Sequence, residues 1–380
     1  MEVFEKTTHT VAATGLTSEE TGYWIGFNRV LGIGPVNFRL LLDYFQDDLA
    51  AAWRADSQEL TRAGLQQKTL DGFLAQRVKI EPERELERLE RQQVSILTWR
   101  DPAYPALLRE IEASPPVIYL RGELKEADRF ALAVVGTRNA SSYGQQVTER
   151  LVTELARGQV TVVSGLALGI DAIAHASALH AGGRTLAVLA CGLDVVYPSK
   201  NRGLAQRICE SGQGALISEY PLGVRPESGN FPARNRIISG LSQGVLITEA
   251  PTKSGALITT SFALKQGRDV FAVPGSIFSS RSTGTNVLIR DGARLVQDVQ
   301  DILNALNLFM LPQQMEFQQA LPENAEERML LALLSHEPVH IDELILASDL
   351  PAPTVTATLT MLELKGLVRT LGSTQFVLAR

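Results

Sequence analysis

Short apolar runs recur through the middle of the chain, separated by longer stretches in which apolar and polar positions follow a helical period. Each run is too short to be a helix, and most are rich in β-branched residues. The stretches between them, about 10–16 residues each, suit single helices. This alternation predicts βαβ units and an extended Rossmann-like parallel sheet in an α/β core. The runs are LAVVG (132–136), VTVVSG (160–165), RTLAVLACG (184–192), GALISEY (214–220), GVLITEA (244–250) and DVFAVPG (269–275).

Helical patterns dominate the region before this core. A charged helix is predicted over 81–93 and a strand over 94–99. The segment RVLGIGPVNFRLLLDYF (29–45) sets Gly32 and Gly34 in a turn between two helices, as in SAM or helix-hairpin-helix modules. Such a turn can present backbone N–H groups to a DNA phosphate. A helix pair that only packs fits the same pattern, so both interpretations stay open.

The end of the chain follows the order helix, helix, turn, helix and two-stranded ribbon, which predicts a winged helix. Its expected recognition helix (353–366) contains no Arg, Asn or Gln, the side chains that read base edges. We therefore interpret this module as a protein-contact or structural one. The predicted organisation is a helical SAM/helix-hairpin-helix-like domain (1–90), a Rossmann-like core (91–307), a linker (308–324) and a winged-helix domain (325–380).

The charge distribution favours the core as the place where an anionic partner binds. The 380-residue chain has a net charge of −6, but residues 131–300 hold 16 Lys/Arg against 11 Asp/Glu, a net of +5. Residues 323–380 hold four basic and eight acidic side chains, a net of −4. A local excess matters more than the total for binding nucleic acid.

Other features narrow the class of protein. No apolar run is long enough for a membrane helix, and the first residues carry no secretory signal pattern. Cys191 and Cys209 match neither a zinc spacing nor a disulfide framework. We therefore expect a cytoplasmic protein with no metal, no cofactor and no membrane partner.

Glycines end several of the predicted strands, where open α/β sheets bind their ligands. In VVGTRNAS (134–141) and SGLALGIDAIAH (164–175), a strand, a glycine loop and a helix start follow one another. Backbone N–H groups and the helix dipole favour phosphate at such a position. Asp171 and His175 share a helix face, either as an acid/base pair or as structural groups, and we favour the structural interpretation. The predicted phosphate-binding residues here are Gly136, Thr137, Arg138, Gly165 and Gly169.

Three later strand ends place basic and small polar residues at helix starts. Tyr197 and Phe231 are their aromatic neighbours in the sequence. Basic side chains beside aromatic ones suit a single nucleic-acid strand, because phosphates meet charge while bases stack on rings. The candidate residues are Lys200, Asn201, Arg234, Asn235, Arg236, Lys253, Ser254 and Gly255.

The ordered series of these motifs resembles the DNA-processing protein A (DprA/Smf) family. The resemblance implies a Rossmann-like protein that binds single-stranded DNA, usually as a homodimer, protects incoming DNA in natural transformation and loads the RecA recombinase. It also implies that Arg138, Lys200, Arg234, Arg236 and Lys253 contact DNA. The series is VVGTR, SGLALGIDAIAH, CGLDVVYP, SEYP, FPARNRIISGLS, TEA, KSGALIT, VPG and TNVLIRDGA.

Two other functions are alternatives to this one. A phosphoribohydrolase-like enzyme would carry PGGxGTxxE at a strand end, whereas VPGSIFSS (273–280) lacks the second glycine and the Glu. Glu249 and Asp171 could act as acid and base, but no motif organises them. A winged-helix transcription regulator is disfavoured by the poor base-reading surface. We expect no enzymatic activity.

Overall fold

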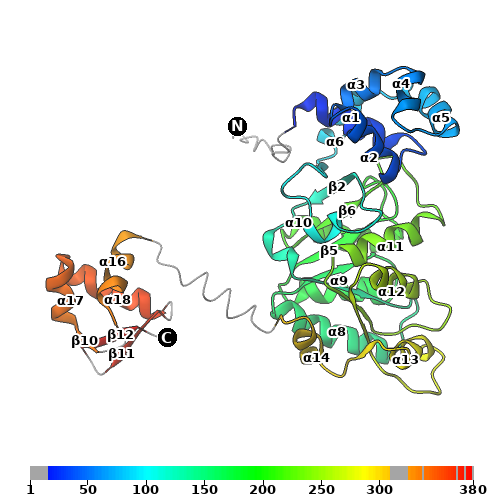
Figure 1. Cartoon of the computed structure of the whole chain (residues 1–380). Helices are drawn as coiled ribbons and strands as arrows, with labels where there is room; N and C mark the ends of the chain where they lie inside the picture. The colour runs from blue at the N-terminus through cyan, green and yellow to red at the C-terminus, as the bar shows by residue number, and fades with distance from the viewer. Residues whose placement is uncertain (1–15, 309–323, 336–337, 365–366, 372–373, 379–380) are drawn as a thin grey trace, which may run out of the picture. The chain divides into compact units, whose positions relative to one another are not determined.

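A computed structural model of the chain describes residues 16–308, 324–335, 338–364, 367–371 and 374–378. The chain divides into two compact units, Met1–Leu308 and Phe309–Arg380. A helical bundle and an α/β core make up the first unit, and a small helical module with a three-stranded sheet makes up the second (Figure 1). The predicted linker 308–324 lies outside the described residues apart from its two end positions.

The described residues of the first unit form a nine-stranded sheet in the order β1-β2-β6-β5-β4-β3-β7-β8-β9. The strands from β3 to β9 pair in parallel, whereas β2 is antiparallel to both β1 and β6. The prediction of an α/β fold with a Rossmann-like parallel sheet is confirmed. The strands are β1 Ser95–Thr98, β2 Val117–Gly122, β3 Ala131–Val135, β4 Thr161–Ser164, β5 Thr185–Val188, β6 Gly214–Ser218, β7 Gly244–Ile247, β8 Asp269–Ala272 and β9 Arg294–Leu295.

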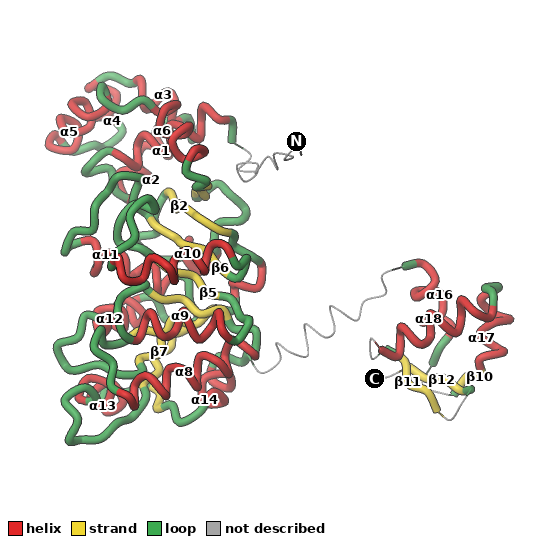
Figure 2. Tube along the Cα trace, turned by 180° about the vertical axis from the view of Figure 1, so that it is seen from behind, coloured by secondary structure: helices red, strands yellow, loops and turns green. Residues whose placement is uncertain are grey.

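Helices cover both faces of the sheet because the strand order reverses once. The chain moves outward from β3 through α8, α9 and α10 to β6, and these three helices follow one another along one face (Figure 2). It then crosses back to β7 through α11 and moves the other way, which places α11, α12 and α13 on the opposite face. The bounds are α7 Ala106–Arg109, α8 Ser142–Arg157, α9 Ile170–His180, α10 Arg202–Glu210, α11 Asn230–Gly240, α12 Ala256–Lys265, α13 Thr283–Arg290 and α14 Val299–Ala305.

The N-terminal helices share a hydrophobic core with the sheet. Phe27 packs against Trp53 and Phe73, with ring centroids 4.9 and 5.2 Å apart, and the same cluster continues into Tyr119 of β2 and Leu189 after β5. Burial of this cluster ties the bundle to the α/β core in one unit. The helices are α1 Ser18–Arg29, α2 Pro35–Tyr44, α3 Leu49–Arg54, α4 Ser57–Arg62, α5 Gln67–Arg77 and α6 Pro82–Arg91.

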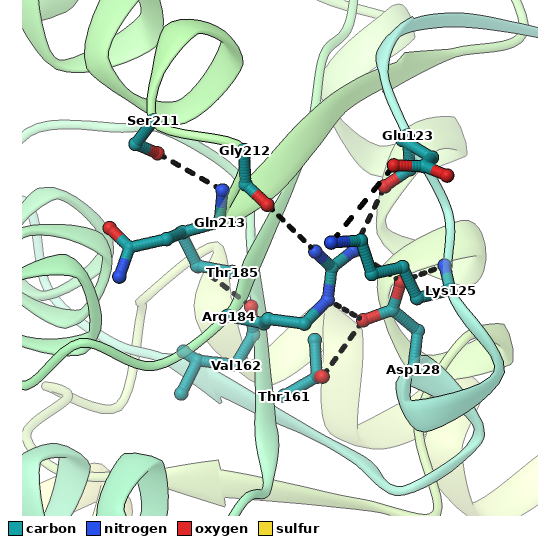
Figure 3. Close-up of polar contacts among 10 residues, drawn as sticks. All are labelled: Glu123, Lys125, Asp128, Thr161, Val162, Arg184, Thr185, Ser211, Gly212 and Gln213. Atoms are coloured by element: carbon teal, nitrogen blue, oxygen red, sulfur yellow. Dashed lines mark hydrogen bonds and ion pairs between the residues drawn. The ribbon is translucent and has the colours of Figure 1, made fainter.

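A largely covered ion pair connects the amino ends of the central strands. Asp128 accepts hydrogen bonds from Arg184 Nε at 2.8 Å, Arg184 Nη2 at 2.7 Å and Thr161 Oγ1 at 2.9 Å (Figure 3). Arg184 also donates to the carbonyl oxygens of Glu123 and Gly212, at 2.9 and 3.2 Å. The network joins the segment before β3 to the starts of β4 and β5, on the edge of the sheet opposite the predicted site.

The second unit has the helix and strand order of a winged helix, as predicted. Its core gathers Leu330, Leu344, Leu359 and Phe376. Among the described residues of the whole chain, no helix has both the length and the apolar character that a membrane span requires. The elements are α16 Ala325–Leu333, β10 Val339–His340, α17 Ile341–Ser348, α18 Ala352–Leu364, β11 Val368–Leu371 and β12 Gln375–Leu378.

Candidate nucleic-acid interface

The predicted site residues gather at the carboxyl ends of the parallel strands. β3 lies where the strand order reverses, between β4 and β7. The chain leaves β3 and β7 toward opposite faces, which is the arrangement at which α/β sheets bind ligands. In this chain the loops after the two strands are joined, because Thr137 N donates to the carbonyl oxygen of Glu249 at 2.7 Å. The candidate residues all lie on the loops after β3, β4, β5 and β7 or on helix α11 after β6.

A carboxylate of the protein itself occupies the start of helix α8. Glu249, in the loop after β7, accepts hydrogen bonds from the backbone N of Ser141 at 2.8 Å and from its Oγ at 2.6 Å, and Glu249 is buried. Negative charge at this position is stabilised by the helix dipole, as a phosphate would be. A carboxylate of the protein therefore takes one backbone donor of the cradle predicted after β3, and phosphate binding by Gly136, Thr137 and Arg138 stays a prediction.

A second carboxyl group, in the first turn of α9, holds the loop that precedes that helix. Asp171 accepts from the backbone N of Gly165 at 3.1 Å and of Ala167 at 3.3 Å. Burial raises the pKa of Asp171, against the lowering effects of Arg234 and of these hydrogen bonds. His175, one turn later, lies 2.6 Å from Thr185 Oγ1, and burial lowers the pKa of this imidazole to about 3. The structure thus agrees with the structural interpretation of the Asp171 and His175 pair.

Close packing explains the glycines of the predicted cradles. A Cβ atom on Gly136 would lie 2.6 Å from Ile170, and one on Gly165 would lie 2.6 Å from the guanidinium of Arg234. Gly169 has a φ of +74°, a conformation that favours glycine. These positions keep the loops compact against neighbouring side chains, so the approach of a phosphate is not needed to explain them.

Arg234 faces the interior and not the surface. Its guanidinium donates to the carbonyl oxygen of Gly165 at 2.7 Å and to that of Val188, and the residue is 5% exposed. Burial lowers the pKa of Arg234, partly opposed by the charge of Asp171. The expectation that Arg234 contacts DNA is corrected, because its charged group is enclosed beneath the loop after β4.

Arg236 is likewise engaged inside the fold. It forms a two-pronged ion pair with Glu219, both contacts at 2.6 Å, and donates to the carbonyl oxygen of Ala113 at 2.9 Å. Burial acts to lower the pKa of Arg236, but the hydrogen bonds and charge of Glu219 outweigh it and raise that pKa. Its guanidinium has no free edge for a phosphate, which corrects a second predicted DNA contact.

Two smaller candidates also serve the fold. The amide of Asn201 donates to the carbonyl oxygens of Leu166 and Ala167, at 2.8 and 3.2 Å, and is buried. The hydroxyl of Thr137 accepts from the backbone N of Asn139 at 3.2 Å and is also largely covered. Both side chains shape the loops that carry the exposed residues of the site.

An aromatic and basic cluster stands open at the same edge. The guanidinium carbon of Arg138 lies 5.7 Å from the ring centroid of Phe231, and the rings of Phe231 and Tyr197 lie 5.6 Å apart. Arg138 is exposed, and Tyr197 keeps 48% of its surface in solvent. These three side chains come from the loops after β3 and β5 and from the first turn of α11. Together they form a surface that carries two aromatic rings and one positive charge.

Helices α11 and α12 begin at glycines. Their N-cap residues are Gly229 and Gly255, and neither residue supplies a side-chain cap. The carbonyl oxygen of Gly255 accepts from the Asn235 side chain at 3.4 Å, so the start of α12 lies beside the second turn of α11. The first backbone donors of α12 are taken within the loop, because Ala256 N donates to the Ser254 hydroxyl at 3.3 Å and Leu257 N to the Ser254 carbonyl oxygen at 3.1 Å. Lys253, just before this turn, is exposed.

Four exposed cations surround these features, and we call them the strand-end cations. Within the part of the chain that the structure describes, none of them is ion-paired. Sequence reasoning missed Arg225, which lies in the loop after β6 outside any motif. The basic excess of the core and the position of this loop at a strand end were the signals available for it. The strand-end cations are Arg138, Lys200, Arg225 and Lys253.

Comparison with protein families gives two matches. A family described as DNA recombination-mediator protein A matches residues 95–307, and the DprA winged helix domain matches residues 316–373. Protein Smf of Synechocystis is 36% identical over 93% of this chain and 97% of its own length. DNA processing protein DprA of Bacillus subtilis is 39% identical over 67% of this chain and 88% of its own length.

Two solved structures are similar as well. DNA processing protein A from Streptococcus pneumoniae superposes with a TM-score of 0.66 at 36% identity, covering 75% of this chain and 97% of that one. DNA processing protein A from Helicobacter pylori has a TM-score of 0.51 at 34% identity, covering 56% of this chain and 95% of that one. The latter structure concerns that protein's single-stranded DNA binding mode.

Proposed function

Because the chain belongs to the DNA recombination-mediator protein A (DprA/Smf) family, we propose that it binds single-stranded DNA at the carboxyl edge of its central strands. One observation carries the proposal: the cluster of exposed Arg138, half-buried Phe231 and exposed Tyr197 at the strand-end edge that also carries the exposed Lys253. The single-stranded DNA binding mode described for the Helicobacter pylori relative supports it.

The cluster suits a single strand better than a duplex. Bases in a duplex are stacked on one another, so their faces cannot reach Phe231 or Tyr197, whereas unpaired bases can. Stacking uses the π face that every base has, so little sequence preference is expected. The strand-end cations would take the phosphates between the stacked bases, with Lys253 assisted by the dipole of α12.

The number of free cations sets the expected salt dependence. Four contacts, at about 0.7 each for a single strand, give a slope of log K against log salt near −3. Arg234 and Arg236 are not counted, because their charges are already paired or enclosed.

Fluorescence anisotropy with labelled oligothymidylate and with a duplex of equal length tests the proposal. We expect tight, length-dependent binding of the single strand, weaker binding of the duplex and a salt slope near −3. Phe231→Ala should weaken single-strand binding by roughly tenfold, since a stacking contact is lost. Tighter binding of the duplex, or no effect of Phe231→Ala, would exclude the proposed interface.

The wider role follows from the family. We propose that the protein acts in the cytoplasm as a homodimer, protects incoming strands in natural transformation and delivers them to a RecA-type recombinase. Exposed apolar side chains on α12 and β9 support contacts with other proteins, because such groups gain by being covered. They are Ile258, Leu264 and Leu295, which are 39%, 67% and 43% exposed. Sedimentation velocity of the full chain, alone and with recombinase, tests both contacts.

A catalytic role has less support. Glu249 and Asp171, the carboxylates with acid or base potential, are both buried, and both accept hydrogen bonds from backbone N–H groups of neighbouring loops. Neither is presented to a substrate, and we propose that the protein binds DNA without chemical conversion. Release of free base from nucleoside monophosphates would contradict this.

A further inference from the structure

Two large apolar side chains stand in solvent at the tip of the loop after β8. Ile277 and Phe278 are 82% and 94% exposed, and Phe278 has the highest exposed fraction among the large hydrophobic residues that the structure describes. Leaving a whole aromatic ring in water forgoes the stabilisation that burial would give. Adjacent exposed apolar groups of this size mark a surface that a binding partner covers.

The backbone of this loop is held in place. The side chain of Asn286 forms two hydrogen bonds with Gly275. Its Oδ1 accepts from Gly275 N at 3.1 Å, and its Nδ2 donates to the Gly275 carbonyl oxygen at 3.0 Å. The backbone N of Ser279 donates to the carbonyl oxygen of Ser276 at 3.0 Å, and that of Phe278 donates to the Ser276 hydroxyl at 3.2 Å. The ring is therefore presented on an ordered turn, so binding requires little further ordering of the backbone.

Hydrogen bonds connect this loop to the segment after β7 and, through it, to α11. The base of the loop joins the segment after β7 through Gly284 N to the carbonyl oxygen of Ala250, at 2.8 Å, and through Thr252 N to Thr283 Oγ1, at 3.3 Å. Lys253 follows Thr252 directly. Beyond it, Gly255 contacts Asn235, which lies four residues after Phe231 on α11 and hence on the same helix face. These contacts thus connect the loop after β8 to α11 through the segment that carries Lys253.

We propose that the loop 275–282 extends the single-strand interface and that Phe278 stacks on a nucleobase beyond Lys253. This inference rests on the proposed function and names a second stacking position for it. A phenylalanine ring can stack on any base, and the intervening phosphates meet Lys253 and Arg281. Arg281 is half-buried, and no described carboxylate is paired with it. Basic surroundings favour an anionic strand over a second copy of this chain as the group that covers the ring.

The test is a length series with the full chain and its variants. The oligothymidylates range from about 6 to about 20 nucleotides, so that the shortest cover only part of such a surface and the longest cover all of it. Phe278→Ala should weaken the long oligonucleotides by roughly fivefold or more and leave the shortest nearly unchanged. Phe231→Ala should weaken both. Phe278→Tyr should restore long-strand affinity, whereas Phe278→Leu, which is apolar without a ring face, should not.

A variant at another exposed apolar residue serves as the control, and each contrary outcome has its own measurement. Val78→Ala removes an exposed apolar group at the end of α5 and should not alter binding. Equal affinity of Phe278→Ala and the unchanged chain at every length, while Phe231→Ala weakens binding, overturns this inference and leaves the proposed function standing. Absence of oligothymidylate binding by the unchanged chain overturns the proposed function instead. A shift in oligomeric state by Phe278→Ala in sedimentation, with DNA affinity intact, would assign the loop to a second copy and also overturns the inference.

Discussion

Replacing Arg138 with alanine should weaken single-strand binding without disturbing the fold. Arg138 is exposed, has no ion-pair partner among the described residues, and places its guanidinium 5.7 Å from the ring of Phe231. Its removal therefore takes a charge and a forked donor from the interface while leaving the interior intact. The helix start behind it keeps its own carboxylate, Glu249, and does not collapse.

The size of the effect follows from two contributions. A charge pair at about 4 Å in a solvent-exposed setting is worth about 1 kcal/mol. Loss of the guanidinium from the aromatic surface adds about 0.5–1 kcal/mol. A total near 1.5–2 kcal/mol corresponds to a loss of affinity of roughly 10- to 30-fold. One fewer phosphate contact should also make the salt slope shallower by about 0.7.

Arg157 supplies a matched control for the assay. It is exposed at the far end of α8, about 24 Å along that helix at 1.5 Å per residue, and its removal changes net charge equally. Anisotropy titrations at several salt concentrations should separate Arg138→Ala from Arg157→Ala, and Arg138→Lys should fall between Arg138→Ala and the unchanged chain. Equal losses for Arg138→Ala and Arg157→Ala, with both proteins folded, would show that binding is diffuse electrostatic attraction and would refute the site.

Three further predictions address other parts of the molecule. Deleting residues 324–380 should change single-strand affinity by less than about threefold, because that segment is acidic overall; a loss of about a hundredfold in the same titration would contradict this. Burial lowers the pKa of His175 from 6.5 to about 3. Between these two pH values the imidazole of the unfolded chain is protonated, whereas that of the folded chain is neutral. The free energy of unfolding should therefore fall on acidification through this window by up to about 1.4 kcal/mol per pH unit, and urea titrations at several pH values should show a shallower dependence for His175→Gln. Arg184→Ala should lower the free energy of unfolding by about 3 kcal/mol, since it strands the Asp128 carboxylate, and the double variant with Asp128→Ala should lose less than the sum of the two single ones.

The fold could be predicted because its signals are local. Apolar runs that alternate with helical stretches mark the parallel strands β3 to β8 along the chain. β2 was not among the predicted strands: its residues Val117–Leu120 are all buried, so they lack the alternation of a half-exposed strand, and two prolines precede them. A strand buried on both faces is identified by its neighbours, and those are distant in the sequence.

The sequence predicted at which edge of the sheet the site lies, but not which side chains are exposed there. Sequence reasoning put Arg234 and Arg236 at the right sheet edge, yet a residue type near a helix start does not reveal which way the side chain points. Both turn inward because buried carbonyl oxygens and Glu219 need their donors. The hydrogen bond from Ser141 N to Glu249 at the start of α8 joins residues 108 positions apart, and no local sequence pattern predicts such a contact. The exposed cluster around Phe231 was found because its aromatic and basic residues recur at successive strand ends.

The carboxyl groups at the first turns of α8 and α9 also affect where an anionic ligand can bind. In many α/β proteins, the first helix start after the central strand is where a free mononucleotide or dinucleotide docks. Here the Glu249 carboxylate accepts from Ser141 N at the start of α8, and Asp171 accepts from Gly165 N in the loop before α9. A phosphate placed at either position would meet a carboxyl group of the protein, so the exposed strand-end cations are the groups left for it, and a polymer that lies across them contacts several at once.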